Sequence, residues 1–179
     1  GLKTRNFDTI KQEIEYFFNL FSKRKELITL NRHNKNDKTD NHVIKPIFII
    51  GVPRCGSTLI EKIIASGSQY IPIGEETGII HAVVKNLINQ KQSLNLDIDQ
   101  FQTKIVEICK QKGLVQEESN YIFTDKSLEN FFYIDIIKEI FPQAKVINCR
   151  RNVISSIMST LKNNLFTLPW AHNLEHIFK

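Results

Sequence analysis

The sequence predicts an α/β domain in which a parallel β-sheet is covered by helices on both faces. Three short apolar runs rich in β-branched residues, at 46–51, 121–124 and 145–149, are typical of buried parallel strands. Segments with helical spacing of their apolar residues lie between and after these runs. Strands that alternate with helices indicate parallel pairing, because the chain must return across a face of the sheet before the next strand begins.

The elements follow one another in a simple order along the chain. Residues 6–30 place apolar side chains at helical spacing, which predicts an amphipathic helix. Residues 31–42 are polar throughout and predict a solvated linker. We therefore expect an N-terminal helix and linker over 1–44 and the main domain over 45–179. The helices expected in the main domain lie at 57–66, 77–90, 98–112, 131–141 and 153–161.

Composition narrows the class of protein without choosing a function. The formal charge of +5 and the pI near 9.1 suit a polyanionic ligand, but the lysines are scattered and not clustered with aromatic residues, which disfavours nucleic-acid binding. Three cysteines without C-x-x-C spacing predict neither a disulfide framework nor a zinc site and favour a reducing compartment. No segment resembles a signal peptide or a membrane span, so we expect a cytoplasmic protein.

The junction between the first strand and its helix predicts a phosphate-binding loop. Residues 51–58 read GVPRCGST, close to a P-loop, in which Gly51 and Gly56 let the backbone amides converge at a helix N-terminus. Ser57 stands where a nucleoside triphosphatase needs its lysine, and Arg54 is the only cation in the loop. The loop therefore predicts binding of a nucleotide phosphate without a metal, and the alternative is a strand–helix turn without a ligand.

A second anion site is predicted after the strand at 145–149. Arg150 and Arg151 follow this strand where a magnesium-binding acid would stand, and Ser159 lies two helical turns further on. The carboxyl ends of parallel strands share one edge of a sheet, so these groups and the phosphate loop are expected to bind two phosphates of one ligand. The alternative interpretation is a solvated helix start.

These motifs together resemble the sulfotransferase superfamily, which uses 3′-phosphoadenosine-5′-phosphosulfate (PAPS). PIFIIGVPRCGSTLIEKIIAS at 46–66 resembles the 5′-phosphosulfate loop, and CRRNVISSIMS at 149–159 resembles the 3′-phosphate motif. GEET at 74–77 and FTDKSLENFFYIDIIKEIFPQAKVI at 123–147 are most similar to tyrosylprotein sulfotransferases and bacterial relatives. Residues 4–18 are similar to the segment that joins tetratricopeptide repeats to such domains, so upstream repeats are implied as partners.

The resemblance implies a role for each matching residue. The 5′-phosphosulfate would be bound by Arg54, Cys55, Gly56, Ser57 and Thr58, and the 3′-phosphate by Arg151 and Ser159. Arg54 would also neutralise the leaving phosphate. Glu76, or alternatively Glu75, would be the general base, and Lys126 would stabilise the transferring sulfuryl group. His81 is a further candidate base, and the resemblance implies no metal.

Several positions depart from the family pattern. Cys55 replaces the usual serine, Asn152 and Val153 replace Asp-Pro, and Ser127 stands where proline is usual. Sulfotransferases also continue with elements that complete the sheet and bind the acceptor, so we expect the domain to be truncated on its C-terminal side. The alternatives to a sulfotransferase are a non-catalytic nucleotide-binding fragment and a degenerate P-loop kinase or NTPase. The acceptor hydroxyl could belong to protein tyrosine or to carbohydrate, and Gly78 replaces the arginine that follows GEET in tyrosylprotein enzymes.

Overall fold

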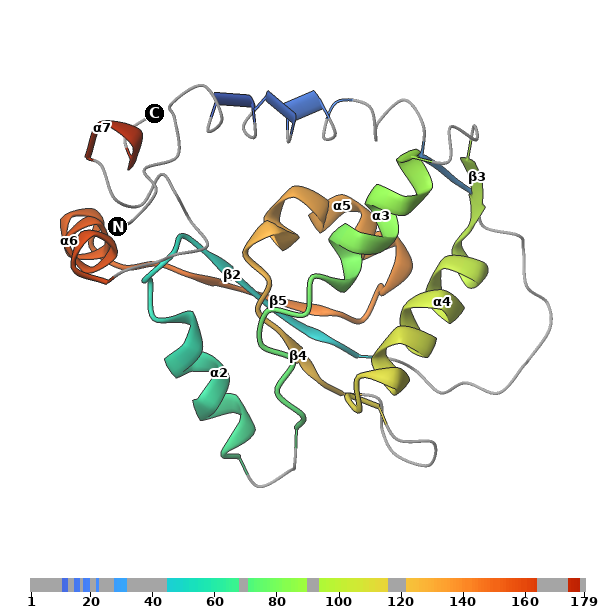
Figure 1. The fold of residues 1–179 in the computed structure, drawn as a ribbon. Helices are drawn as coiled ribbons and strands as arrows, with labels where there is room; N and C mark the ends of the chain where they lie inside the picture. Colours follow the sequence, from blue (N-terminus) through green and yellow to red (C-terminus); the bar gives the residue numbers. More distant parts are fainter. Residues whose placement is uncertain are drawn as a thin grey trace.

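A three-stranded parallel sheet forms the centre of the fold (Figure 1). The structure is a computed structural model that describes residues 11–12, 15–16, 18–19, 22, 28–31, 45–67, 71–89, 94–115, 122–163 and 174–177. The strands are β2 (Ile47–Gly51), β4 (Thr124–Asp125) and β5 (Lys145–Cys149), in the order β4-β2-β5. Ile47 pairs with Thr124 on one side and with Lys145 on the other. The predicted parallel α/β architecture is confirmed.

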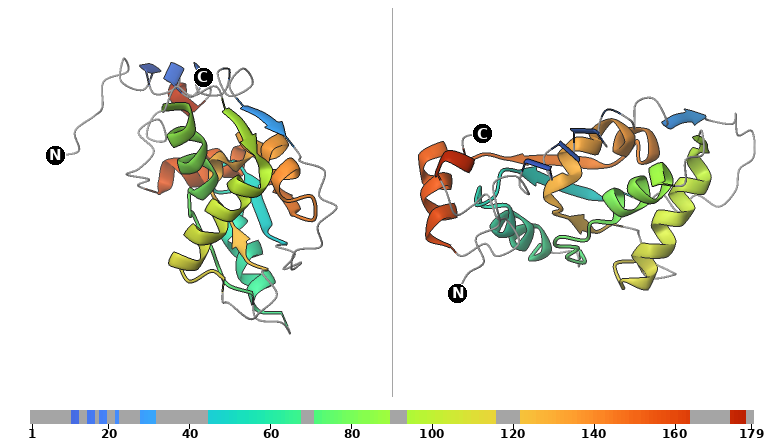
Figure 2. Two further views of the ribbon diagram at one scale, coloured as in Figure 1. Left: turned by 90° about the vertical axis from the view of Figure 1, so that its right-hand side faces the viewer. Right: turned by 45° about the horizontal axis from the view of Figure 1, so that its top comes forward.

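Helices cover both faces of this sheet because the side chains of β2 alternate between two hydrophobic clusters. Phe48 packs with α3 (Ile79–Asn89), α4 (Ile98–Gln111) and α5 (Ile134–Ile140), where the largest cluster of buried side chains lies. Ile49 faces the other way and packs with α2 (Ser57–Ala65). Helices α3 and α4 lie side by side in both views of Figure 2. The remaining helical elements are the 3₁₀ helix η1 (Leu128–Tyr133), α6 (Val153–Lys162) and α7 (Leu174–Ile177).

Most predicted elements of the main domain agree with the structure to within two residues at each end, and two differ more clearly. The strand predicted at 121–124 is β4, which is only two residues long and ends at Asp125, although Phe123 still accepts a hydrogen bond from the Ile47 amide at 2.8 Å. The helix predicted at 131–141 begins earlier, as η1, and continues as α5. The amide of Asn130 bonds to the Ser127 carbonyl at 3.1 Å, so the turn closes directly after the strand.

A two-stranded parallel pairing was not predicted. It joins β1 (Ile28–Asn31) to β3 (Leu94–Asp97). Residues 28–30 are therefore strand and not the end of the predicted helix, whose described residues between 11 and 22 are helical. Apart from Asn31, the predicted linker lies outside the described residues, and the domain division at residue 44 stays a prediction. Within the part of the chain that the structure describes, none of the helices has the length and apolar character needed to span a membrane.

Candidate active site

The predicted phosphate loop joins β2 to α2 in the conformation that an anion site needs. Arg54 and Gly56 have left-handed backbones, with φ of 65° and 99°, which curl the loop so that successive amides turn toward one side. Gly56 is the N-cap of α2 and has no side chain, so no side chain caps the first turn of the helix. The first amides of α2 and their share of the helix dipole are therefore directed at the space above the loop.

Gly51 allows the end of β5 to lie directly against this loop. A Cβ at Gly51 would lie 2.6 Å from the Cys149 carbonyl oxygen and 2.7 Å from Cys55 Sγ. The Cys55 thiol is 7% exposed and packs with Cys149 beneath the loop, and the Cys55 amide donates to the Val52 carbonyl at 3.2 Å. Burial, together with the adjacent Cys55 thiol, raises the pKa of Cys149. Binding of the 5′-phosphosulfate by Cys55 stays a prediction. In the structure, the Cys55 side chain packs beneath the loop and supports it.

The second predicted anion motif meets the first at this edge of the sheet. Arg54 Nε donates a hydrogen bond to Ser159 Oγ at 3.1 Å, and Arg151 Nη1 donates to the Arg54 carbonyl at 3.3 Å. Both arginine side chains are exposed, so their remaining donors face solvent. Asn152 caps α6 by accepting from the Ser155 amide at 3.1 Å, which fixes the start of the helix that carries Ser159. Two segments far apart in the sequence thus meet at Arg54.

A loop at residues 74–78, which we call the GEET loop, is held beside the end of β4 by backbone hydrogen bonds. The amide of Gly74 donates to Thr124 Oγ1 at 3.1 Å, and the amide of Gly78 donates to Ser127 Oγ at 2.8 Å. The carbonyl of Glu75 accepts from the Lys126 amide at 2.7 Å. These contacts hold Glu75 at φ 41°, a conformation that non-glycine residues rarely adopt.

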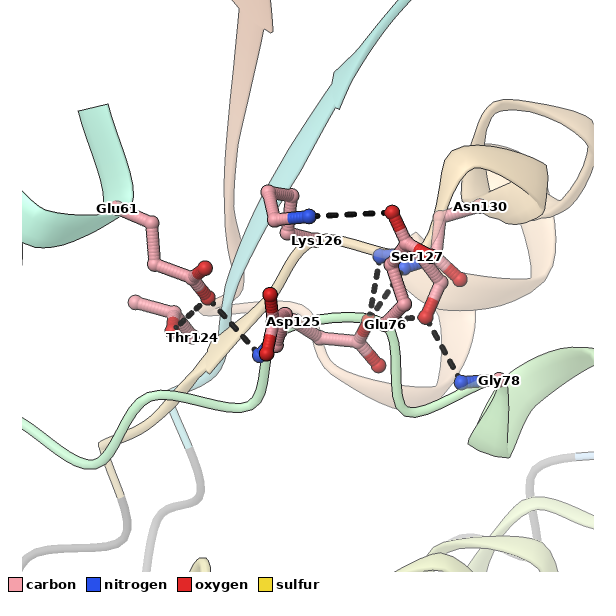
Figure 3. A network of polar contacts seen from close by, with 9 residues as sticks. Glu61, Glu76, Gly78, Thr124, Asp125, Lys126, Ser127 and Asn130 are labelled. Atoms are coloured by element: carbon pink, nitrogen blue, oxygen red, sulfur yellow. Dashed lines mark hydrogen bonds and ion pairs between the residues drawn. The ribbon is translucent and has the colours of Figure 1, made fainter. Parts of the chain in front are cut away.

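Two buried carboxylates complete the attachment of the GEET loop (Figure 3). Asp125 accepts from Ser127 N and Oγ and from Asn130 Nδ2 at 2.9, 2.6 and 3.1 Å, and its second oxygen accepts from Thr77 Oγ1 at 2.6 Å. Glu61 accepts from Thr124 Oγ1 at 2.6 Å and from the Glu75 amide at 3.1 Å. Several donors around each carboxylate offset the cost of burying its charge.

Glu76 and Lys126 form an ion pair at the edge of this network (Figure 3). Lys126 Nζ lies 3.2 Å from Glu76 Oε1. The lysine side chain is only 5% exposed, whereas the glutamate side chain is 63% exposed. The pair therefore consists of a buried ammonium group and a carboxylate that reaches solvent.

His81, the other candidate base, lies on α3 and contacts Tyr133. Its Nδ1 is 2.7 Å from the tyrosine hydroxyl oxygen. The side chain is half-buried, and this burial lowers the pKa of His81, against an opposing effect of the nearby Glu129. The structure thus places His81 in a packed contact with an aromatic hydroxyl.

The lowered pKa of His81 makes stability depend on pH in a defined direction. The unfolded chain binds a proton at this histidine as the pH falls below about 6.5, whereas the folded chain resists it. We therefore expect the free energy of unfolding to fall on acidification below pH 6.5 and this fall to be shallower in His81→Asn. Urea denaturation of both proteins between pH 7.5 and 5.5 measures the difference, and parallel pH profiles would contradict the expectation.

Sequence reasoning assigned no role to Glu61, Thr124 or Asp125, although all three stand within the quoted motifs. The signals for the two acids were a lone glutamate among the apolar residues of α2 and an aspartate directly after the strand predicted at 121–124. The structure brings Arg54, Arg151 and Ser159 together at one place and Glu76 and Lys126 together at another. Among the described residues, no three His, Cys, Asp or Glu side chains gather as a metal site.

Comparison with known proteins assigns the family. The sequence model of the Sulfotransferase family matches residues 46–177, which is most of the chain and includes the three-stranded sheet and the helices that cover it. This chain belongs to the sulfotransferase family. An uncharacterized protein of Aquifex aeolicus (strain VF5) is 29% identical over 150 residues, which cover 74% of this chain and 19% of that protein. The chain thus spans about a fifth of its relative's length. The sulfotransferase resemblance is confirmed, and the finer similarity to tyrosylprotein or repeat-linked enzymes stays a prediction.

Proposed function

We propose that this sulfotransferase domain binds PAPS and transfers its sulfuryl group to an acceptor hydroxyl. The observation that carries the proposal is the meeting of the two anion motifs at Arg54, which donates to Ser159 and accepts from Arg151. One ligand with phosphates at both ends of a ribose requires two cationic sites at a short, fixed separation. The family match supports the same nucleotide.

The phosphate loop supplies the donors for the 5′ end of this ligand. The amides at the start of α2, the hydroxyls of Ser57 and Thr58 and the Arg54 guanidinium would bind the 5′-phosphosulfate. Arg151 and Ser159 would bind the 3′-phosphate. The left-handed Arg54 and Gly56 backbones support this fit, because they shape the loop as an anion-binding concavity before any ligand arrives.

The ion pair supplies the groups for the transfer step. Glu76 would accept the proton of the acceptor hydroxyl while the oxygen attacks sulfur, and the bond between sulfur and the bridging oxygen of the 5′-phosphate breaks. Lys126 and Arg54 would neutralise the charge on the sulfuryl oxygens and on the departing 3′,5′-adenosine bisphosphate. The 3.2 Å contact of the Glu76 side chain with Lys126 supports this assignment over Glu75.

The acceptor, partners and compartment are further parts of the proposal. A tyrosine hydroxyl or a carbohydrate hydroxyl fits the step equally, since either presents one proton to Glu76. Residues 4–18 resemble the segment that follows tetratricopeptide repeats, which supports such repeats as upstream partners. The three cysteines are free thiols, which supports the cytoplasm as the site of action.

Calorimetric titration with 3′,5′-adenosine bisphosphate in EDTA tests the donor site. We expect wild-type binding, and a loss of about 1.5–3 kcal/mol in Arg151→Ala, as for a charge-assisted hydrogen bond. This loss is roughly 10- to 150-fold in Kd.

Arg150→Ala is the matched control, because it removes the same charge from the neighbouring exposed residue. Its Kd for 3′,5′-adenosine bisphosphate should lie within about twofold of the wild-type value if specific contacts contribute more than the long-range electrostatic field of the protein. Equal losses in both variants would assign the effect to charge alone, and absence of wild-type binding would contradict the proposed donor.

A further inference from the structure

Glu61 is a buried carboxylate whose hydrogen bonds all leave its own helix. It lies in the second turn of α2 and is 1% exposed. Its Oε1 accepts from Thr124 Oγ1 at the end of the sheet and from the Glu75 amide in the GEET loop. An apolar side chain would serve helix packing at this position without the cost of burying a charge. Packing of α2 therefore does not explain why this position carries a carboxylate. Its hydrogen bonds to Thr124 and to the Glu75 amide do.

The backbone that Glu61 holds leads directly to the proposed base. Glu75 is fixed from both sides, because its amide donates to Glu61 and its carbonyl accepts from the Lys126 amide. These two bonds keep Glu75 at φ 41°, which an unrestrained glutamate would leave for a more favourable conformation. The direction of the next residue, Glu76, depends on this conformation.

Helix α2 also carries the donor site at its other end. Its N-cap, Gly56, and its first residues, Ser57 and Thr58, belong to the phosphate loop. Glu61 lies one turn further along the same rigid helix, so one element sets the positions of both the phosphate loop and the GEET loop. A donor bound at the start of α2 would therefore have a fixed relation to the Glu76 carboxylate.

We propose that Glu61 is a positioning residue for sulfuryl transfer, which acts by fixing the Glu75 backbone and thereby the direction of Glu76. The inference rests on the proposed function for its catalytic consequence. The structural half of the inference is that Glu61 fixes the Glu75 backbone. This half can be tested without any measurement of activity.

Hydrogen exchange of the Glu75 amide, followed by NMR, tests the structural half. In Glu61→Ala the amide loses its acceptor, and its exchange should accelerate by about tenfold or more. Glu61→Gln keeps an oxygen of nearly the same position and should give an intermediate rate; it also serves as the test variant should the alanine protein not fold. Ile64→Ala, on the same helix, is the matched control, because it removes apolar packing against Ile49 of the sheet and Ile64 takes no part in the hydrogen bonds that hold Glu75.

Kinetics test the catalytic half, with PAPS as donor and a panel of phenols, tyrosine peptides and sugars as acceptors. In Glu61→Ala we expect kcat to fall by about tenfold or more, with the KM for PAPS and the Kd for 3′,5′-adenosine bisphosphate within about twofold of wild type. Glu61→Gln should recover most of kcat. Ile64→Ala should lower thermal stability and keep kcat.

The outcomes separate this inference from the proposed function. Unchanged Glu75 exchange in both Glu61 variants, or an equal loss of kcat in Ile64→Ala, would overturn the positioning role. A wild-type protein that neither binds 3′,5′-adenosine bisphosphate nor transfers sulfuryl groups would overturn the proposed function, and the exchange rates would still decide whether Glu61 fixes Glu75.

Discussion

Replacing Glu76 by glutamine is expected to lower kcat for sulfuryl transfer by about 10²- to 10⁴-fold, the usual contribution of a general base. The amide keeps the size of the side chain and can still accept from Lys126 Nζ, which lies 3.2 Å from the carboxylate in the wild type. It cannot take the proton of an acceptor hydroxyl. Transfer of radiolabelled sulfate from PAPS to the best acceptor of the panel measures the loss.

Glu75→Gln is the control that the sequence itself offers. Both residues are exposed glutamates in the same loop, but Glu75 contributes its backbone to the attachment of the loop, whereas Glu76 contributes its side chain to the ion pair. We expect Glu75→Gln to keep kcat within about threefold of wild type, as for a surface substitution. A larger loss in Glu75→Gln than in Glu76→Gln would assign the base to Glu75 instead.

Replacing Gly74 by alanine is expected to destabilise the fold by about 3 kcal/mol, the upper end of the usual cost of overpacking. The added Cβ would lie 1.9 Å from the Thr124 carbonyl oxygen and 3.0 Å from the carbonyl carbon. Both atoms are backbone of a strand that is paired with β2, so they cannot move aside as a flexible side chain would. Urea denaturation measures the free energy of unfolding.

Gly113→Ala separates this clash from the general effect of losing a glycine. Gly113 has φ 71° after α4, and an added Cβ there meets no atom within 4 Å. It should therefore cost only about 1–2 kcal/mol, the penalty of a left-handed backbone for alanine. A Gly74→Ala protein no less stable than Gly113→Ala would contradict the close approach of the GEET loop to β4.

The sequence predicted the parts of the site that depend on local pattern. The loop at 51–58 could be placed at a strand–helix junction because its glycines and hydroxyls fit a P-loop pattern, and phosphate binding by it stays a prediction. The meeting of Arg151 and Ser159 with this loop followed from a general rule, that parallel strands end at one edge of the sheet. Both predictions needed only short-range pattern and the fold class.

The rest depended on contacts between distant residues. Nothing near Glu61 in the sequence indicates that its partners are Thr124 and the Glu75 amide, since these lie on other elements. The pairing of β1 with β3 was missed for the same reason, because β-structure is stabilised by neighbours that the local sequence does not contain. Likewise, the local sequence does not indicate that Thr124 and Asp125 accept hydrogen bonds from Gly74 and Thr77 of the GEET loop.

The order of the strands along the chain affects how the protein folds. The central strand, β2, comes first along the chain among the three, and Ile47 finds its partners only at Thr124 and Lys145. Long loops must close before these pairings can form, which makes parallel sheets of this kind slow to fold. During synthesis the phosphate loop thus emerges long before the strands that shape it. We expect anion binding at this loop to appear in the final stage of folding, so that it reports completion of the sheet.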